Sequence, residues 1–204
     1  RASIDFLTNA HSGTGRDGAF IRASNDGSTA KAHLICGTIN DETYAETVRI
    51  DSSGRTLIGH TAAHSVGGGN SLLQIQATNS TGRISVVQHR NEAGGSPFIS
   101  LGKSRGTSNG STTILQSGDE IGTLTWAGAD GNDLDNQACC ITGVVDGTPG
   151  SNDMPGRLEF RTTSDGSATA TTRMKISKEG YVTKSYQPSF MAYGNSSWTD
   201  LNAG

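Results

Sequence analysis

Residues 157–177, RLEFRTTSDGSATATTRMKIS, contain the pattern that decides the fold class. Apolar and polar residues alternate over 157–162 and again over 172–177, so successive side chains point to opposite faces of an extended chain. Between the two runs, Asp165 and Gly166 tolerate the positive φ angles that a tight β-hairpin turn requires. The stretch therefore predicts two antiparallel strands in a sheet with one solvated face.

Short apolar runs rich in Ile, Val and Thr, separated by Gly, Asn and Asp, continue along the chain, as is typical of strands joined by turns. Only residues 40–47, NDETYAET, have the composition of a helical turn, with Asn40 as its N-cap. We therefore expect an all-β protein. The strands are predicted over residues 2–8, 18–24, 31–38, 47–51, 55–59, 72–77, 82–90, 97–102, 112–116, 120–127, 138–145, 157–162, 172–177 and 181–185.

The composition predicts a folded chain with a thin core. Of the 204 residues, 101 are Gly, Ser, Thr, Asn or Asp, and only 36 are Leu, Ile, Val or Phe. Chains this poor in large apolar residues stay disordered when their net charge is also high, but here the net charge at pH 7 is only −3. The low charge and the bounded apolar runs therefore favour folding.

The same composition excludes several classes of protein. No run approaches the roughly 18 apolar residues of a membrane-spanning helix, which argues against insertion into a membrane. Gly and Thr interrupt any heptad, and Gly has no three-residue period, so neither a long coiled coil nor collagen fits. Scattered Arg residues form no basic stripe, which argues against nucleic acid as a partner. Because the chain starts at Arg1 without a signal-like segment, we expect it to be part of a longer protein.

An internal repeat suggests how the strands are grouped. Residues 48–58, VRIDSSGRTLI, match 174–184, MKISKEGYVTK, since each reads as a strand, a loop closed by Gly and a second strand. A Gly-rich joint follows the first copy. We therefore predict a first β module at residues 1–59, a joint at 60–71, a second and larger β module at 72–186, and a tail at 187–204.

The three cysteines are an odd number without the spacing of a metal site. We interpret Cys36, Cys139 and Cys140 as small buried thiols, because free cysteine is among the most buried residue types. A disulfide framework is not expected.

Long parts of the sequence resemble the tail-fibre proteins of tailed bacteriophages, marine phages in particular. VRIDSSGRTLIG (48–59) is similar to a hairpin that recurs along such fibres. ISLGKSRGTSNGSTTILQSGDEIGTLTWAGADG (99–131) and VVDGTPGSNDMPGRLEFRTTSDGSATATTRMKI (144–176) are similar to longer modules of the same proteins. QPSFMAYG (187–194) resembles the start of a C-terminal head domain, so we expect the rest of that domain to lie outside this sequence. The second hairpin copy departs from the pattern at 182–184, which suggests the end of a repeat array.

The resemblance implies a structural, non-enzymatic fibre segment without a cofactor, located in the virion and acting outside the cell. It implies β-sandwich-like modules in series, intertwined as a homotrimer, that contact other virion tail proteins. The segment would space and present a distal tip that binds a receptor on the host cell surface during attachment. A glycan is the expected class of receptor. The thin core gives an independent reason for the trimer, because three interlocked chains bury more apolar area and pair exposed sheet edges.

Two other functions remain open: a glycan-cleaving tailspike and a bacterial surface adhesin. A tailspike of the glycosidase type needs two carboxylates on either side of the scissile bond. The strand-borne acids are Asp5, Asp51, Glu120 and Glu159, and nothing in their spacing places two of them together.

Two glycine motifs are interpreted as turns. Residues 13–18 match the dinucleotide fingerprint GxGxxG, and residues 106–110 match the nucleophile motif GxSxG. Both motifs need a helix to follow, and a predicted strand follows each of them here.

The acidic loop ADGNDLD is a weak candidate for calcium. Its oxygen ligands would come from Asp130, Asn132, Asp133 and Asp135, but Leu134 occupies the third alternate position and the sixth residue is not Gly. We therefore favour a solvated loop. His60 and His64 lie four residues apart outside any predicted helix, so a histidine metal site is not expected.

Loops carried on rigid sheets are the usual positions for recognition. Three long predicted loops are 103–111, 128–137 and 146–156. Trp126 alternates with Leu124 and is expected in the core, whereas Trp198 lies in the tail. The candidate surface-recognition residues in these loops are Arg105, Asn109, Asp133 and Asp153.

Overall fold

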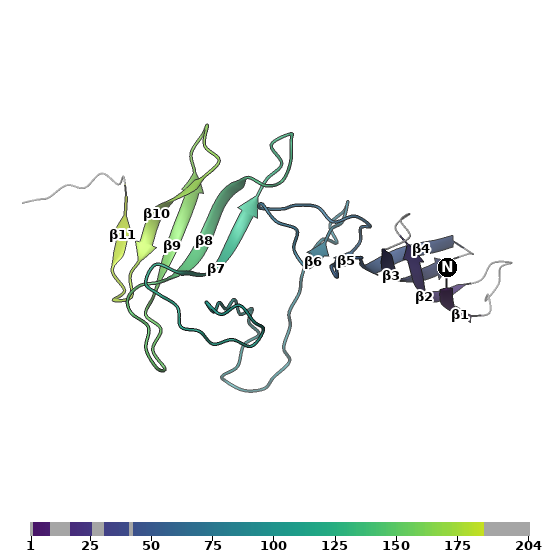
Figure 1. Ribbon diagram of the computed structural model, residues 1–204, viewed down its shortest axis with the longest axis horizontal. Helices are drawn as coiled ribbons and strands as arrows, with labels where there is room; N and C mark the ends of the chain where they lie inside the picture. The colour runs from purple at the N-terminus through teal and green to yellow at the C-terminus, as the bar shows by residue number, and fades with distance from the viewer. Residues whose placement is uncertain (1, 9–16, 26–30, 41–42, 186–204) are drawn as a thin grey trace, which may run out of the picture. The chain divides into compact units, whose positions relative to one another are not determined.

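The computed structural model describes residues 2–8, 17–25, 31–40 and 43–185 (Figure 1). These residues are strands, turns and irregular segments, and none of them is helical, which confirms the all-β prediction. The chain divides into two compact units. Unit 1 is Arg1–Ser100 with Ala127–Gln137, and unit 2 is Leu101–Trp126 with Ala138–Gly204.

Unit 1 contains a six-stranded sheet in which every strand lies beside its neighbour in sequence. The first five strands pair antiparallel, and the last two pair parallel. The strands are β1 (Ala2–Thr8), β2 (Asp17–Asn25), β3 (Ala32–Asn40), β4 (Thr43–Ile50), β5 (Thr56–Ile58) and β6 (Leu73–Ile75).

One face of this sheet holds a small core of Phe20, Ile35 and Ile39. Gly37 lies directly opposite Phe20 in the register. A Cβ at Gly37 would come within 2.6 Å of the Phe20 ring and 2.1 Å of the Ala45 carbonyl oxygen, so only glycine allows this approach. The core is thin because its one aromatic ring, that of Phe20, packs against the backbone of Gly37, which has no side chain.

Unit 2 contains a five-stranded sheet in the order β11-β10-β9-β8-β7. Its neighbours from β8 to β11 pair antiparallel. Val144, Val145 and Thr142 on β8 are its most deeply buried side chains. The strands are β7 (Glu120–Ala127), β8 (Gln137–Val145), β9 (Gly156–Thr163), β10 (Ala170–Ile176) and β11 (Val182–Lys184).

The two copies of the repeated sequence form the same hairpin. Val48 pairs with Ile58 in unit 1, and Met174, at the equivalent position, pairs with Lys184 in unit 2. In each turn the glycine amide donates to the carbonyl three residues earlier at 2.9 Å, with positive φ at Gly54 (77°) and Gly180 (85°). The sequence repeat therefore corresponds to a repeated structural unit.

The structure corrects the predicted helical turn at 40–47. Residues 43–50 are β4, which pairs with β3 along its length, from Thr43 opposite Asn40 to Ile50 opposite Leu34. Residues 41 and 42 lie outside the described residues. Pairing with a neighbouring strand has outweighed the local preference for a turn, as tertiary context often does.

The structure also corrects three predicted strands. Residues 82–90, 97–102 and 112–116 all lie in one long connection, residues 77–119, in which the structure contains no strand. These stretches have β-type sequence but no partner strand within the described chain. We refer to residues 77–119 below as the long connection.

The cysteines are free thiols, and only Cys140 is fully buried, while Cys36 and Cys139 are half-buried. In the described part of the chain there is no helix that could cross a membrane. The predicted tail at 187–204, with Trp198, and residues 13–16 of the GxGxxG motif lie outside the described residues. The module boundaries at 59 and 72 stay a prediction.

Candidate functional site

An open hollow of about 660 Å³ lies within unit 1, between the Gly-rich joint and the β7–β8 hairpin tip. Its polar lining includes His64, Gln76, Asn132 and Asp133. The Gln76 amide and His64 Nδ1 lie 3.2 Å apart, which fixes both side chains at the rim. The hollow therefore brings one predicted recognition residue, Asp133, beside polar groups from a distant part of the sequence.

Two backbone amides of the Gly-rich joint donate hydrogen bonds to the β7–β8 hairpin tip. The Gly67 amide donates to the Leu134 carbonyl at 2.9 Å, and the Gly68 amide donates to Asp135 Oδ1 at 3.2 Å. His60 and His64 stack with ring centroids 5.8 Å apart, and the His60 Nδ1 lies 2.7 Å from the Ala62 carbonyl oxygen.

The carboxylates of the candidate calcium loop are occupied by the loop itself. Asp130 Oδ1 accepts hydrogen bonds from the amides of Asn132 (2.8 Å) and Asp133 (3.1 Å), and Asp133 Oδ1 accepts from the amide of Asp135 (2.9 Å). The backbone amide of Asn132, more than any other group, lowers the pKa of Asp130 from its ordinary value. Among the described residues no three His, Cys, Asp or Glu side chains gather as a metal site would require. The acidic residues therefore shape the loop through their own hydrogen bonds, and the weak calcium site stays a prediction.

Arg105 forms a bidentate ion pair with Asp119. Its Nε and Nη2 lie 2.6 and 2.8 Å from the two carboxylate oxygens. The hydrogen bonds from Arg105 hold the pKa of Asp119 well below its ordinary value, and the hydrogen bond from the Gln116 amide has the second largest effect in the same direction. Arg105 thereby ties the loop at 103–113 to the turn before β7, so the predicted recognition residue has a structural partner.

The other three predicted recognition residues lie in three different loops, one of which also carries Arg105. Asn109 is exposed in the same loop as Arg105, where the GxSxG motif forms a turn closed by the Ser111 amide donating to the Ser108 carbonyl at 3.1 Å. Asp153 lies in the β8–β9 loop, in which its amide and carbonyl both pair with Gly150. The structure therefore groups Arg105 with Asn109 and places Asp133 in the other unit. Their recognition role stays a prediction.

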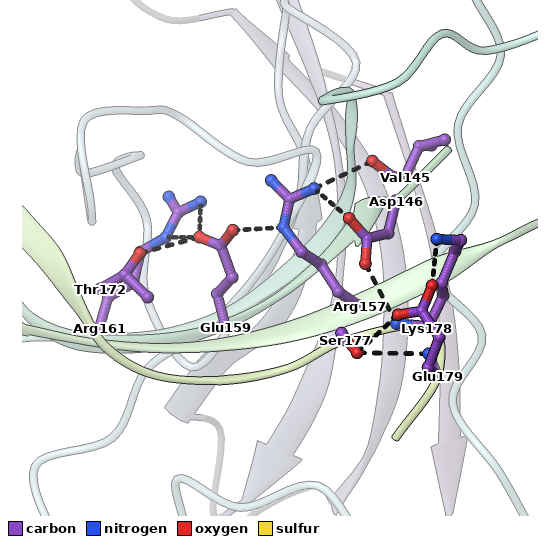
Figure 2. A network of polar contacts seen from close by, with 9 residues as sticks. All are labelled: Val145, Asp146, Arg157, Glu159, Arg161, Thr172, Ser177, Lys178 and Glu179. Atoms are coloured by element: carbon purple, nitrogen blue, oxygen red, sulfur yellow. Dashed lines mark hydrogen bonds and ion pairs between the residues drawn. The ribbon is translucent and has the colours of Figure 1, made fainter. Parts of the chain in front are cut away.

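A network of charged side chains crosses one face of unit 2 (Figure 2). Glu159 on β9 is only 7 % exposed. It accepts hydrogen bonds from Arg157 Nε at 2.6 Å, from Arg161 Nη2 at 2.8 Å and from the Thr172 hydroxyl at 2.9 Å. Arg157 also donates to Asp146 Oδ1 at 3.1 Å. Arg157, Glu159 and Arg161 share this face because they are two residues apart on one strand.

The network keeps Glu159 ionised. Burial alone would raise the pKa of its carboxyl group, but the hydrogen bonds from Arg157, Arg161 and Thr172 outweigh burial and lower the pKa to about 2. A general acid in a glycosidase needs the opposite shift, so that it still holds a proton near neutral pH.

The network also joins two of the four strand-borne acids. Arg161 Nη1 lies 2.6 Å from Glu120 Oε1, so one guanidinium bridges Glu120 and Glu159. Sequence spacing missed this pairing because it depends on β7 and β9 lying near each other. Of the other two acids, Asp51 pairs with Arg55 at 2.7 Å, and Asp5 accepts a hydrogen bond from the Tyr44 hydroxyl at 3.0 Å.

The face of the unit 1 sheet opposite to the Phe20 core is apolar and partly exposed. The register aligns apolar residues in one row across all six strands, and Cα partners in such a row share a face. Ile4, Phe6, Ile21, Leu34 and Ile50 on this face are between 42 and 61 % exposed. We call the row the apolar ladder: Ile4, Ile21, Cys36, Val48, Ile58 and Ile75.

Unit 2 has a similar half-exposed apolar face. Phe160 stands between Ile141 and Met174 in the register, opposite to the charged network. The Thr123 hydroxyl donates to the Thr142 hydroxyl at 3.2 Å, which places Thr123 on the network side. Leu124 and Trp126 alternate with Thr123 and thus lie on the apolar side, where each is about half exposed. The prediction that Trp126 is buried in the core is therefore wrong for this chain by itself.

The comparisons with known proteins point to one architecture. No family model matches the chain, and no curated protein matches it. The solved C-terminal domain of the bacteriophage T5 L-shaped tail fibre matches all of this chain and 85 % of its own length, with a TM-score of 0.66 and 14 % identity. The same domain solved with its intramolecular chaperone domain gives a TM-score of 0.67 and 13 % identity, and there the match covers 59 % of its length. The chain therefore has the fold of a phage tail-fibre C-terminal domain.

Proposed function

We propose that this chain is a structural segment of a phage tail fibre that assembles as a homotrimer and presents a receptor-binding tip to the host. The observation that carries the proposal is the match of the whole chain to the T5 tail-fibre domain. The segment belongs in the virion, beside other tail proteins, and acts outside the host cell during attachment.

The uncovered apolar faces support self-association. A single chain leaves Ile4 and Ile21 of the apolar ladder exposed in unit 1, and it leaves Leu124 and Leu158 exposed in unit 2, where Leu101 lies over Gly122 on the same face. Contiguous exposed apolar surfaces of this kind mark interaction sites. Identical copies related by symmetry would cover both faces with the same chemistry, since each copy presents the same residues.

The role of the segment is mechanical. A closed trimer of sheets would resist bending, so it would hold the distal tip in a fixed position relative to the rest of the fibre. Three tips held together would convert a weak contact with each host glycan into avidity. Additional contact with the receptor would fall on exposed groups of this chain, such as Asn109 and the hollow beside Asp133.

A glycosidase function is less well supported. Three of the four strand-borne acids are ion-paired with arginine, and the pKa values of Asp51 and Glu159 are lowered. The proposal therefore assigns no catalytic residue and no cofactor to this chain.

Two measurements test the proposal. Light scattering of the purified chain at micromolar concentration is expected to give three times the chain mass, and a monodisperse monomer would contradict the trimer. Electron microscopy of intact particles labelled with an antibody to this chain is expected to show label on tail fibres. Label on a bacterial surface would favour the adhesin. Shortening of host surface polysaccharide by the purified chain would favour the tailspike.

A further inference from the structure

The long connection contains two stretches, 83–90 and 97–101, that have β-type sequence but no strand partner. Five of their apolar side chains, Ile84, Val86, Val87, Phe98 and Ile99, are between 54 and 80 % exposed, whereas Leu101 is 49 % exposed and lies against Gly122 of β7. These five are among the largest apolar exposures of the described chain, and no function derived above uses them. A soluble protein rarely leaves so much apolar surface in one segment without a partner.

Each stretch carries apolar side chains on both faces, but to a different extent. In an extended conformation Ile84 and Val86 point to one side, and Val87 points to the other together with Arg83, Ser85 and His89. In the second stretch Phe98 points to one side, and Ile99 and Leu101 point to the other. A strand on the surface of a sheet needs only one apolar face, whereas a strand that is apolar on both faces is buried on both. Residues 97–101 therefore suit a position between two layers of protein, and residues 83–90 suit a strand whose Ile84 and Val86 face is covered.

The obvious partner within the chain is not used. Residues 91–96 form a short link with two glycines, and such a link could let the two stretches pair with each other as a hairpin. The structure contains no strand pairing there. An isolated two-stranded hairpin with two apolar faces would still expose one of them, so pairing within the chain would not cover this surface.

Charged residues flank the first stretch. Arg83 precedes it, and Arg90, which is ion-paired with Glu92, ends it. Charges at both ends of an apolar strand oppose uncontrolled edge-to-edge aggregation while still allowing a specific partner.

We propose that residues 83–90 and 97–101 form β-strands with a neighbouring copy of this chain, so that the long connection is the segment exchanged between subunits. The inference rests on the proposed trimer and deepens it by naming the segment that crosses between chains. The exchange gives the backbone groups of both stretches strand partners and buries their exposed apolar side chains between subunits. The sheets β1–β6 and β7–β11 keep the pairing that they have in a single chain.

Hydrogen exchange is the first test. In the assembled protein the amides of 84–90 and 98–101 are expected to exchange on the order of a hundredfold more slowly than unstructured amides. The link at 91–96 serves as an internal control and is expected to exchange freely. Free exchange of both stretches in a protein that light scattering shows to be trimeric would overturn the inference and leave the trimer intact. A monomeric wild-type chain would overturn both.

Photo-crosslinking identifies the partner. A Phe98→p-benzoylphenylalanine chain, mixed during refolding with a differently tagged wild-type chain, is expected to give a product that carries both tags. The same photoreactive residue at Ser167, in the exposed β9–β10 turn, serves as a control and is expected to give none. Crosslinks confined to one chain would overturn the inference.

Proline substitutions test the strand pairing itself. Val86→Pro removes an amide donor within the proposed strand and is expected to raise the concentration for half-assembly by on the order of tenfold or more. Ala93→Pro, in the link, is the matched control and is expected to leave assembly unchanged. Equal assembly of the two variants would contradict strand formation over 83–90.

Discussion

Glu159 shows how unit 2 holds a charge at the centre of a thin sheet. It lies between two arginines of its own strand and accepts a hydrogen bond from Thr172 of the next strand, so three donors replace the water that burial removes. The arginines are themselves about one-fifth exposed, and they carry the network out to Glu120 and Asp146. Glu159 therefore contributes through its hydrogen bonds and its charge together.

Glu159→Gln is expected to lower the free energy of unfolding by about 1–3 kcal/mol, because the two arginines lose their shared charged acceptor while the shape is kept. Chemical denaturation measures the change. Glu179→Gln is the matched control, since its ion pair with Lys178 is exposed and exposed pairs contribute little. Equal effects of the two substitutions would contradict the importance of the buried network.

The lowered pKa of Glu159 also predicts a dependence on pH. Its carboxyl pKa is about 2 in the folded protein, against an ordinary value of 4.5. The folded state therefore favours the ionised form, so this stabilisation is complete above the ordinary value and is lost as the pH falls toward 2. The stability difference between wild type and Glu159→Gln should narrow between pH 5 and pH 2, as acid-dependent denaturation curves would show. A constant difference would contradict this.

At the scale of elements, the repeated hairpin is the clearest unit of the fold. Its two copies have equivalent registers and the same turn hydrogen bonds, although their outward side chains differ. Both turns also have a side-chain acceptor at the same position: Asp51 Oδ1 accepts from the Ser53 amide at 2.8 Å, and Ser177 Oγ accepts from the Glu179 amide at 3.3 Å. The shared requirement is the glycine with positive φ.

Gly54→Ala and Gly180→Ala are each expected to destabilise the protein by about 1 kcal/mol, because an L-residue is strained at positive φ. A Cβ at either position would meet open space, so the cost is purely conformational and should be similar in both copies. Chemical denaturation of each variant gives the change. Gly69→Ala is the control, because its Cβ also meets open space and its φ is not in the positive range. A large difference between the two hairpins would show that their turns are not equivalent.

At the scale of the whole molecule, each unit has one sheet with an apolar face that is partly exposed. The opposite face of each sheet is covered by polar or aromatic side chains of the same sheet. The exposed stretches of the long connection add further apolar surface. In the proposed trimer, other copies would bury much of this surface, which would compensate for the small number of large apolar residues.

Ile21→Lys tests the open face of unit 1. Ile21 lies in the apolar ladder and is 42 % exposed in the single chain, so a lysine there costs little burial within the chain. In a trimer that covers the ladder, the same lysine places a charge from each copy in an apolar interface. Analytical ultracentrifugation is expected to show loss of the trimer for Ile21→Lys. Ser52→Lys, in the exposed β4–β5 turn, is expected to remain trimeric. A trimeric Ile21→Lys would exclude the ladder from the interface.

The sequence by itself determined the all-β class, the position of most strands and the repeated hairpin. These depend on local signals, namely alternation of apolar side chains and glycine at turns, which adjacent residues carry. The hairpin of 157–177 is an example, since β9 and β10 form where its alternation predicted them.

Only the tertiary structure decided which strand-like segments find partners. It made residues 43–50 a strand along β3, left 82–90 and 97–102 unpaired, brought Glu120 and Glu159 to one arginine, and exposed Trp126. Each of these outcomes depends on residues far apart in the sequence. A strand gains its hydrogen bonds and half of its burial from a neighbour, so its own residues cannot specify whether that neighbour exists.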